Sequence, residues 1–177
     1  MKSTRKWIAA IMAVLMLVLM AACGNGGNAA NENKAGYRTL EEIKAAGTIN
    51  IGVFSDKNPF GYVDQGYDVY FARRLAEDLG VKVNFISTEA ANRIEYLKTG
   101  KVDVILANFT ITPARAEEVD FALPYMNVAL GVVSPEGRVI TTLEDWDEND
   151  EMIVISGTTA ETYLTENYPN IKLQKYD

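Results

Sequence analysis

The segment VDVILANFTITPARAEEVDF, residues 102–121, decides the fold class and points to a binding site. Its beginning, VDVILAN, is a largely apolar run of the kind found in parallel strands that are buried on both faces. Thr112 and Pro113 then predict a short helix, because threonine is a favoured N-cap and proline suits the first helical turn. Arg115 falls in that first turn, where the positive end of the helix dipole disfavours a cation. An anion from outside the chain would explain why an arginine stands there.

Strand and helix patterns alternate on both sides of this segment. The expected strands are residues 48–54, 81–87, 102–108 and 125–135, and the expected helices are residues 39–47, 67–80, 89–100 and 113–121. Beyond residue 133 a polar stretch precedes a short helix at 143–146, a strand at 152–155, a turn at 156–158, a helix to about 167 and a strand from 171. This order predicts an α/β fold in which helices pack on a largely parallel sheet.

Two turns of the predicted fold share one plan. Residues 108–115 and 156–161 each follow a buried strand, carry hydroxyl side chains and lead into a helix. Ligands collect at the carboxyl ends of strands in open α/β sheets, and free N–H groups at a helix start attract anions. A Thr-x-x-Glu capping box gives the second turn a purely local explanation. In the first turn a forked Arg115 would suit a carboxylate, but it would equally suit Glu118 or another surface acid.

The amino terminus has the layout of a secretory signal peptide. The basic segment MKSTRK precedes WIAAIMAVLMLVLM, an apolar run that is short for a membrane span of about 20 residues, although a plain transmembrane anchor stays an alternative. Cys23 is the only cysteine, so it cannot form an internal disulfide, and it closes LMAAC, which resembles a bacterial lipobox. We therefore expect a lipoprotein signal peptide over residues 1–22, a lipidated Cys23 carrying palmitate, and a flexible Gly/Asn/Ala-rich tether over residues 23–37.

The composition argues against several classes of function. A net charge of −7 and the lack of a basic stripe argue against nucleic-acid binding. The chain contains no histidine, and its single cysteine is assigned to the anchor. These two facts remove histidine-based acid–base catalysis, Ser-His triads, thiolate catalysis and a Cys/His metal set. We therefore expect no cofactor, no metal and no enzymatic activity.

Three stretches of the body carry a family resemblance. They are GTINIGVFSDKNPFGYVDQGYDVYFARRLAEDLGVKVNF, EAANRIEYLKTGKVDVILANFTITPARAEEVDFALPYMNVALGVV and GTTAETYLTENYP. They resemble the extracellular solute-binding proteins of polar amino-acid ABC importers (family 3), and most of all the cysteine-binding lipoproteins. The resemblance implies a periplasmic-binding-protein-like two-lobed clamshell that closes on one free amino acid, with cysteine as the first candidate. Residues 38–128 would form the first lobe without its C-terminal return, and residues 129–177 a hinge strand with an incomplete second lobe.

The resemblance also implies the roles of individual residues. Arg115 would fork onto the ligand α-carboxylate, with help from Thr110 and from Thr158 and Thr159 of the other lobe. Asn108 would offer its backbone carbonyl to the ligand ammonium group. Arg93 would help to select the side chain, unless it is an ordinary solvated helix residue, and Tyr125 would lie at a hinge crossing. The complete implied set is Phe60, Arg93, Asn108, Phe109, Thr110, Arg115, Tyr125, Thr158 and Thr159, with Phe60 as the aromatic lining of the pocket.

The expected partners follow from the same resemblance. They are a free amino acid, the permease subunits of an ABC importer, and the membrane through the lipid anchor, with the protein itself a monomer at the extracytoplasmic face of the cell envelope. Two other functions stay open. The clamshell fold also hosts dehydratases of aromatic amino-acid precursors, and a surface lipoprotein can act as an adhesin, because fold does not determine function.

Overall fold

The computed structural model describes residues 36–62, 64–147 and 149–177. The predicted signal peptide, Cys23 and nearly all of the predicted tether lie outside these residues. Within the part of the chain that is described, no helix is both long enough and apolar enough to span a bilayer.

A parallel three-stranded sheet with the strand order β4–β1–β5 organises the first part of the body. Its strands are β1 (Thr48–Val53), β4 (Lys82–Ser87) and β5 (Val104–Ile105). The parallel pairing confirms the prediction from the strand–helix order. β5 is shorter than the predicted strand over residues 102–108, although the backbone N–H of Leu106 still donates to Gly52. The chain leaves the sheet at Asn108, whose φ of 43° is incompatible with a strand.

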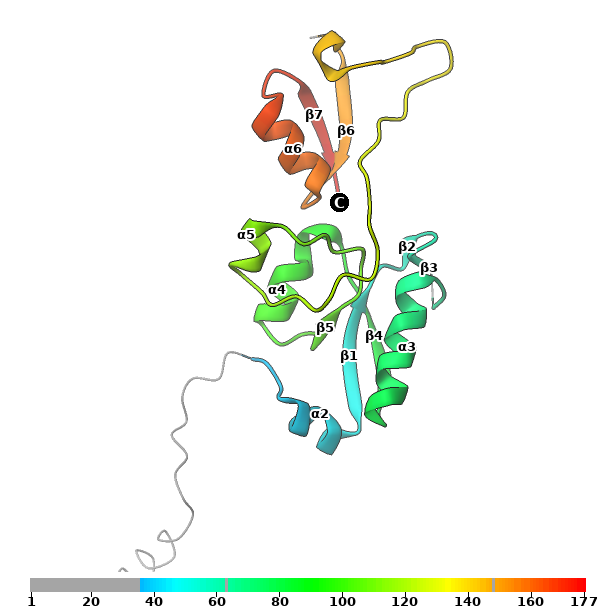
Figure 1. Cartoon of the computed structure of the whole chain (residues 1–177), viewed down its shortest axis with the longest axis vertical. Helices are drawn as coiled ribbons and strands as arrows, with labels where there is room; N and C mark the ends of the chain where they lie inside the picture. The colour runs from blue at the N-terminus through cyan, green and yellow to red at the C-terminus, as the bar shows by residue number, and fades with distance from the viewer. Residues whose placement is uncertain (1–35, 63, 148) are drawn as a thin grey trace, which may run out of the picture. The chain divides into compact units, whose positions relative to one another are not determined.

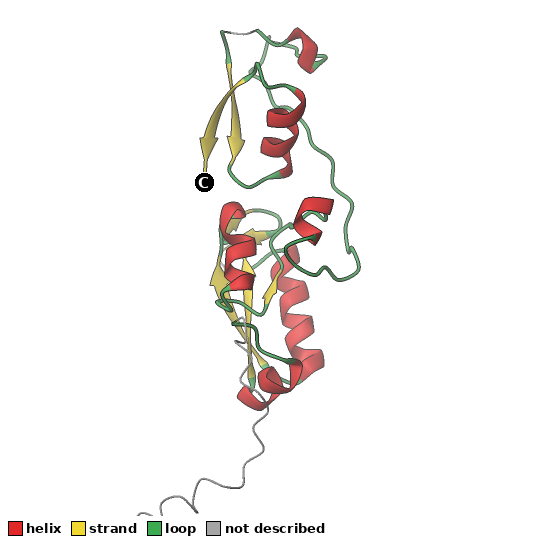
Figure 2. Ribbon diagram, turned by 90° about the vertical axis from the view of Figure 1, so that its left-hand side faces the viewer, coloured by secondary structure: helices red, strands yellow, loops and turns green. Residues whose placement is uncertain are grey.

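Helices cover both faces of this sheet. The connection from β1 to β4 runs one way and the connection from β4 to β5 runs back across β1, so right-handed crossovers place α3 (Tyr67–Leu79) and α4 (Arg93–Lys98) on opposite faces (Figures 1 and 2). A 3-10 turn, η1 (Ala90–Asn92), precedes α4. The main core lies between β1, α2 and α3 and consists of Ile43, Ile49, Ile51, Val53, Val69, Ala72 and Ala76.

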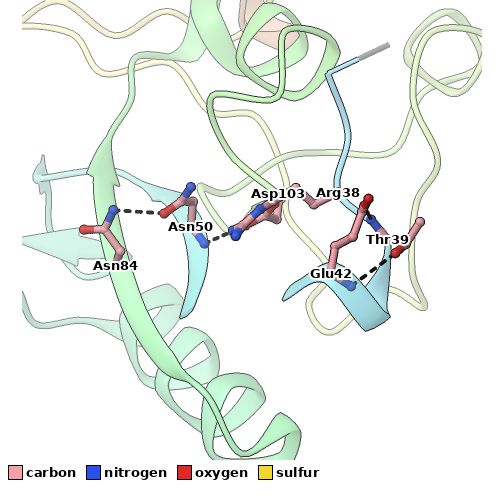
Figure 3. Close-up of polar contacts among 6 residues, drawn as sticks. All are labelled: Arg38, Thr39, Glu42, Asn50, Asn84 and Asp103. Carbon is pink, nitrogen blue, oxygen red and sulfur yellow. Dashed lines mark hydrogen bonds and ion pairs between the residues drawn. The ribbon is translucent and has the colours of Figure 1, made fainter. Parts of the chain in front are cut away.

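The amino-terminal end of the sheet is closed by α2 (Leu40–Ala46) and by a buried acid. Thr39 and Glu42 form the predicted capping box (Figure 3). Gly47 ends the helix with a φ of 66°. Asp103, directly before β5, accepts hydrogen bonds from both Arg38 and the backbone N–H of Asn50. The first folded residues are therefore joined to two neighbouring strands.

Short elements complete the first part of the body. β2 (Asp56–Lys57) and β3 (Gly61–Tyr62) form a small antiparallel hairpin inside the predicted loop over residues 55–66. α5 (Pro113–Ala116) begins at the predicted N-cap Thr112, whose hydroxyl oxygen accepts a hydrogen bond from the backbone N–H of Arg115.

A second, smaller sheet follows as predicted. β6 (Glu151–Ile155) and β7 (Lys172–Tyr176) pair in parallel, with α6 (Thr159–Asn167) between them in sequence and η2 (Leu143–Asp145) before them. Met152, Val154 and Leu164 form its small core. The predicted capping box at α6 is wrong in one detail, because the Glu161 carboxylate accepts from the N–H of Gly157 instead of that of Thr158.

The predicted strand over residues 125–135 is wrong. The structure describes no strand between β5 and β6, and Val133 is 98% exposed. The apolar, β-branched sequence favours an extended backbone, but a strand also needs a neighbour to complete its hydrogen-bond ladder. None of the described strands pairs with this segment.

Candidate functional site

The site lies where the loops at the carboxyl ends of three parallel strands meet. β4 and β5 flank β1, because the connection from β1 to β4 and the connection from β4 to β5 run in opposite directions, and this reversal makes the edge of the sheet a topological switch point. The loop after β1 carries Phe54, the loop after β4 leads to Arg93, and the loop after β5 carries Asn108 and Phe109. The strand order therefore explains why residues far apart in sequence converge here.

Two guanidinium groups pack against one aromatic ring at this position. The Cζ atom of Arg93 lies 4.4 Å from the centroid of the Phe109 ring, and the Cζ atom of Arg115 lies 4.8 Å from it. Phe121 supports the same ring at a centroid distance of 5.2 Å. Cation–π contacts of this kind stabilise a desolvated guanidinium, each by about 0.5–2 kcal/mol. The structure therefore brings together the predicted residues Arg93, Phe109 and Arg115.

Arg93 is buried, with 3% of its surface exposed, so its interpretation as a solvated helix residue is wrong. Its guanidinium donates to the carbonyls of Ala90 (2.9 Å), Ala107 (3.0 Å), Asn108 (3.1 Å) and Gly157 (3.0 Å). Burial, and secondarily repulsion from Arg115, lowers the pKa of Arg93 to about 10, which leaves it charged at neutral pH.

Arg115 also donates to carbonyls. Its Nη1 donates to Thr110 (2.8 Å) and its Nη2 donates to Gly157 (2.8 Å). The alternative in which Arg115 pairs with Glu118 is wrong, because Glu118 pairs with Lys98 at 2.6 Å. Partial burial lowers the pKa of Arg115. The Thr110 carbonyl is thus the described partner of Arg115 within its own loop.

The carbonyl oxygen of Gly157 receives hydrogen bonds from both arginines, although it lies in the turn between β6 and α6. Within the described residues, neither Arg93 nor Arg115 forms an ion pair with an acidic side chain. A carbonyl carries only a partial negative charge, so two full positive charges meet here with incomplete compensation. The local chemistry therefore suits an anion with two acceptor oxygens.

Among the described contacts, none joins the side chains of the other predicted residues Thr158, Thr159, Phe60 and Tyr125 to the two guanidinium groups. Thr158 donates to the carbonyl of Ile155 (2.6 Å) and accepts from the N–H of Glu161 (3.3 Å), and Thr159 begins α6. Phe60 lies half-buried in the loop that joins β2 to β3. The hydroxyl of Tyr125 donates to Asp68, so its described hydrogen bond is to the first part of the body and not to the arginine pair.

Sequence reasoning missed three residues of the site. The centroid of the Phe54 ring lies 5.8 Å from the Cζ atom of Arg93. The position of Phe54 directly after an apolar strand could have indicated that it belongs to the site. Gly157 supplies the shared carbonyl, and only the turn signal at residues 156–158 pointed towards it. Asp68 is fully buried and holds the backbone of Asn108, a role with no local sequence signal. Among the described residues, no group of three His, Cys, Asp or Glu side chains could hold a metal ion.

Comparison with known proteins now defines the class. Residues 49–169 match the model of the bacterial extracellular solute-binding proteins, family 3. The chain belongs to this family. Its relatives include the glutamine-binding protein GlnH of the ABC transporter of Bacillus subtilis (strain 168), which is 28% identical over 95% of this chain and 65% of its own length.

Solved structures support the same assignment. A cysteine-binding protein from Campylobacter jejuni is 55% identical with a TM-score of 0.75, over 78% of this chain and 58% of its own. A solute receptor for L-cysteine from Neisseria gonorrhoeae is 55% identical with a TM-score of 0.76, over 79% of this chain and 60% of its own. The mixed α/β fold like that of periplasmic binding proteins is therefore confirmed. The chain spans less than two thirds of the length of these relatives.

Proposed function

We propose that the protein binds a free polar amino acid outside the cell and delivers it to an ABC importer. The observation that carries the proposal is the convergence of Arg93 and Arg115 on a single carbonyl oxygen, with no acidic partner among the described residues. A ligand α-carboxylate would supply the missing negative charge. It offers two full acceptor oxygens where Gly157 offers one neutral carbonyl.

Arg115 is the guanidinium that we assign to the carboxylate. Its donors reach the Thr110 loop and the Gly157 turn, which are the two segments that the family resemblance places around the ligand. Arg93 is more deeply buried and donates to four backbone carbonyls, so its influence on side-chain selection would act mainly through the shape of the pocket. The assisting roles of Thr110, Thr158 and Thr159 stay predictions.

Cysteine is the first candidate ligand. Two solved proteins that are 55% identical to this chain are described as binding cysteine. The relatives also include a glutamine-binding protein, but its identity is only 28%. The lower identity makes glutamine the second candidate.

The same proposal places the protein at the outer surface of a bacterial membrane. The LMAAC sequence would be cut before Cys23, which would then carry the lipid, and the Gly/Asn-rich residues after it would act as a tether. Metabolic labelling with a palmitate analogue tests this anchor. Label should appear in the parent and be lost in Cys23→Ser, and equal labelling of the two chains would contradict the proposal.

The ligand proposal is tested by calorimetric titration of a panel of free amino acids into the full chain. L-cysteine should release or absorb measurable heat, whereas cysteamine, which lacks only the carboxylate, should not bind. Equal binding of cysteine and cysteamine would remove the carboxylate from the recognition. Turnover of a prephenate-like acid would favour the dehydratase alternative, and binding to a protein partner alone would favour the adhesin alternative.

A further inference from the structure

A buried carboxylate behind the site has no assigned role. Asp68, the second residue of α3, is 0% exposed. One of its oxygens accepts a hydrogen bond from the backbone N–H of Asn108 (2.9 Å), and the other accepts from the hydroxyl of Tyr125 (2.7 Å). Both oxygens are therefore used inside the protein.

The N–H that Asp68 holds belongs to the peptide group between Ala107 and Asn108. The carbonyl of that same peptide group accepts a hydrogen bond from Arg93 Nη1 at 3.0 Å. One peptide group thus bridges a buried carboxylate and a buried guanidinium, and each of these is costly to bury without a partner. Asp68 and Arg93 are thus linked through one neutral peptide group, without a direct ion pair between them.

Asn108 is the residue that this arrangement constrains. Its φ of 43° lies in the left-handed region, which non-glycine residues adopt only when their surroundings hold them there. The next two residues carry the ring of Phe109 and the carbonyl of Thr110, and both contact the guanidinium of Arg115. The orientation of Asn108 therefore determines where the supports of Arg115 lie.

We propose that Asp68 is a positioning residue for the carboxylate site, because its hold on the Asn108 amide fixes the turn that supports Arg115. Tyr125 acts through Asp68 by satisfying the second carboxylate oxygen. The part of this inference that concerns ligand affinity rests on the proposed function, whereas the part that concerns the turn does not.

The test compares two buried carboxylates at the two ends of β5. Asp68→Asn weakens the acceptor at Asn108, and Asp103→Asn is the matched control, because Asp103 also accepts a backbone N–H, that of Asn50 (2.7 Å). The first measurement needs no ligand. By NMR, the Asn108 amide proton should move upfield and exchange about tenfold faster or more in Asp68→Asn, and it should be unchanged in Asp103→Asn.

The second measurement is the dissociation constant for L-cysteine in the full chain. It should rise about tenfold in Asp68→Asn and less than about twofold in Asp103→Asn. Tyr125→Phe, which keeps the carboxylate, should move both measurements in the same direction by less, and it replaces Asp68→Asn if that variant does not fold. An Asn108 amide that is unchanged in both Asp68→Asn and Tyr125→Phe, or an equal loss of affinity in Asp103→Asn, would overturn the inference. If the parent binds no L-cysteine, the proposed ligand fails, and the amide measurement alone supports or overturns the hold on the turn.

Discussion

The buried charges at the two ends of β5 differ in their partners. At the amino-terminal end, Asp103 accepts hydrogen bonds from two nitrogen atoms of Arg38, so a carboxylate and a guanidinium neutralise one another (Figure 3). At the carboxyl-terminal end, Arg93 and Arg115 both donate to the carbonyl of Gly157, and neither forms an ion pair with an acid in the described part of the chain.

This difference separates a structural ion pair from the candidate functional site. A paired charge stabilises the fold only modestly but is costly to disrupt, and it has no further capacity for a ligand. Charge that stays uncompensated in a crevice costs stability, and such costs are concentrated at functional sites. The position of each end fits this division, because ligands collect at the carboxyl ends of parallel strands.

The largest effect on stability should come from the neutralised end. Arg38→Met leaves Asp103 buried without its guanidinium, so the free energy of unfolding should fall by about 3–5 kcal/mol. Urea unfolding measures this loss, with Arg74→Met, which breaks an exposed pair with Glu77, as the control. The comparison fails if the two variants lose the same stability.

Gly157→Ala should have the next largest effect, because it tests the contact that both arginines share. A Cβ at this position would lie 2.6 Å from the Cα of Ala91. The turn that contains Gly157 must therefore move away from Ala91, and its carbonyl moves away from both guanidinium groups. Gly80→Ala is the matched control, since its φ of 70° matches the φ of 74° at Gly157 but nothing lies within 4 Å of its Cβ position.

Both substitutions place a Cβ on a left-handed residue, which lowers the free energy of unfolding by about 1–2 kcal/mol. Gly157→Ala should lose roughly a further 1.5 kcal/mol, because it also weakens hydrogen bonds to charged groups. Urea unfolding of the two variants measures the difference. Equal losses would mean that the carbonyl of Gly157 contributes nothing to the arrangement of the arginines.

The smallest effect is the pH dependence of stability that comes from Asp68. Burial raises the pKa of Asp68, so the folded state binds this proton more tightly than the unfolded state does. The contribution of Asp68 to the free energy of unfolding is therefore full below the unfolded pKa of about 3.9 and is lost as the pH rises through the raised folded pKa. Other acids titrate in both chains, so the contribution of Asp68 is the difference between the urea-unfolding free energies of the parent and of Asp68→Asn. This difference should change with pH across the window, and parallel curves would contradict it.

Local sequence patterns predicted much of the fold and part of the site. The caps of α2 and the N-cap of α5 depend on residues close together in the chain, and the parallel sheet was predicted from the alternation of locally recognisable strands and helices. The burial of Arg93 and the role of Asp68 depend on contacts between residues 14 to 64 positions apart, which no local period encodes. The predicted strand over residues 125–135 was wrong for a similar reason, because pairing requires a partner elsewhere.

The central claim is that Arg115 holds the carboxylate of a free amino acid. Calorimetric titration of L-cysteine into the full chain and into Arg115→Ala tests it most directly, with Arg74→Ala as an exposed arginine control. Loss of a charge-assisted pair in a closed site should weaken binding by about 2–5 kcal/mol, while the control binds as the parent does. An Arg115→Ala variant that binds L-cysteine as tightly as the parent would contradict the account.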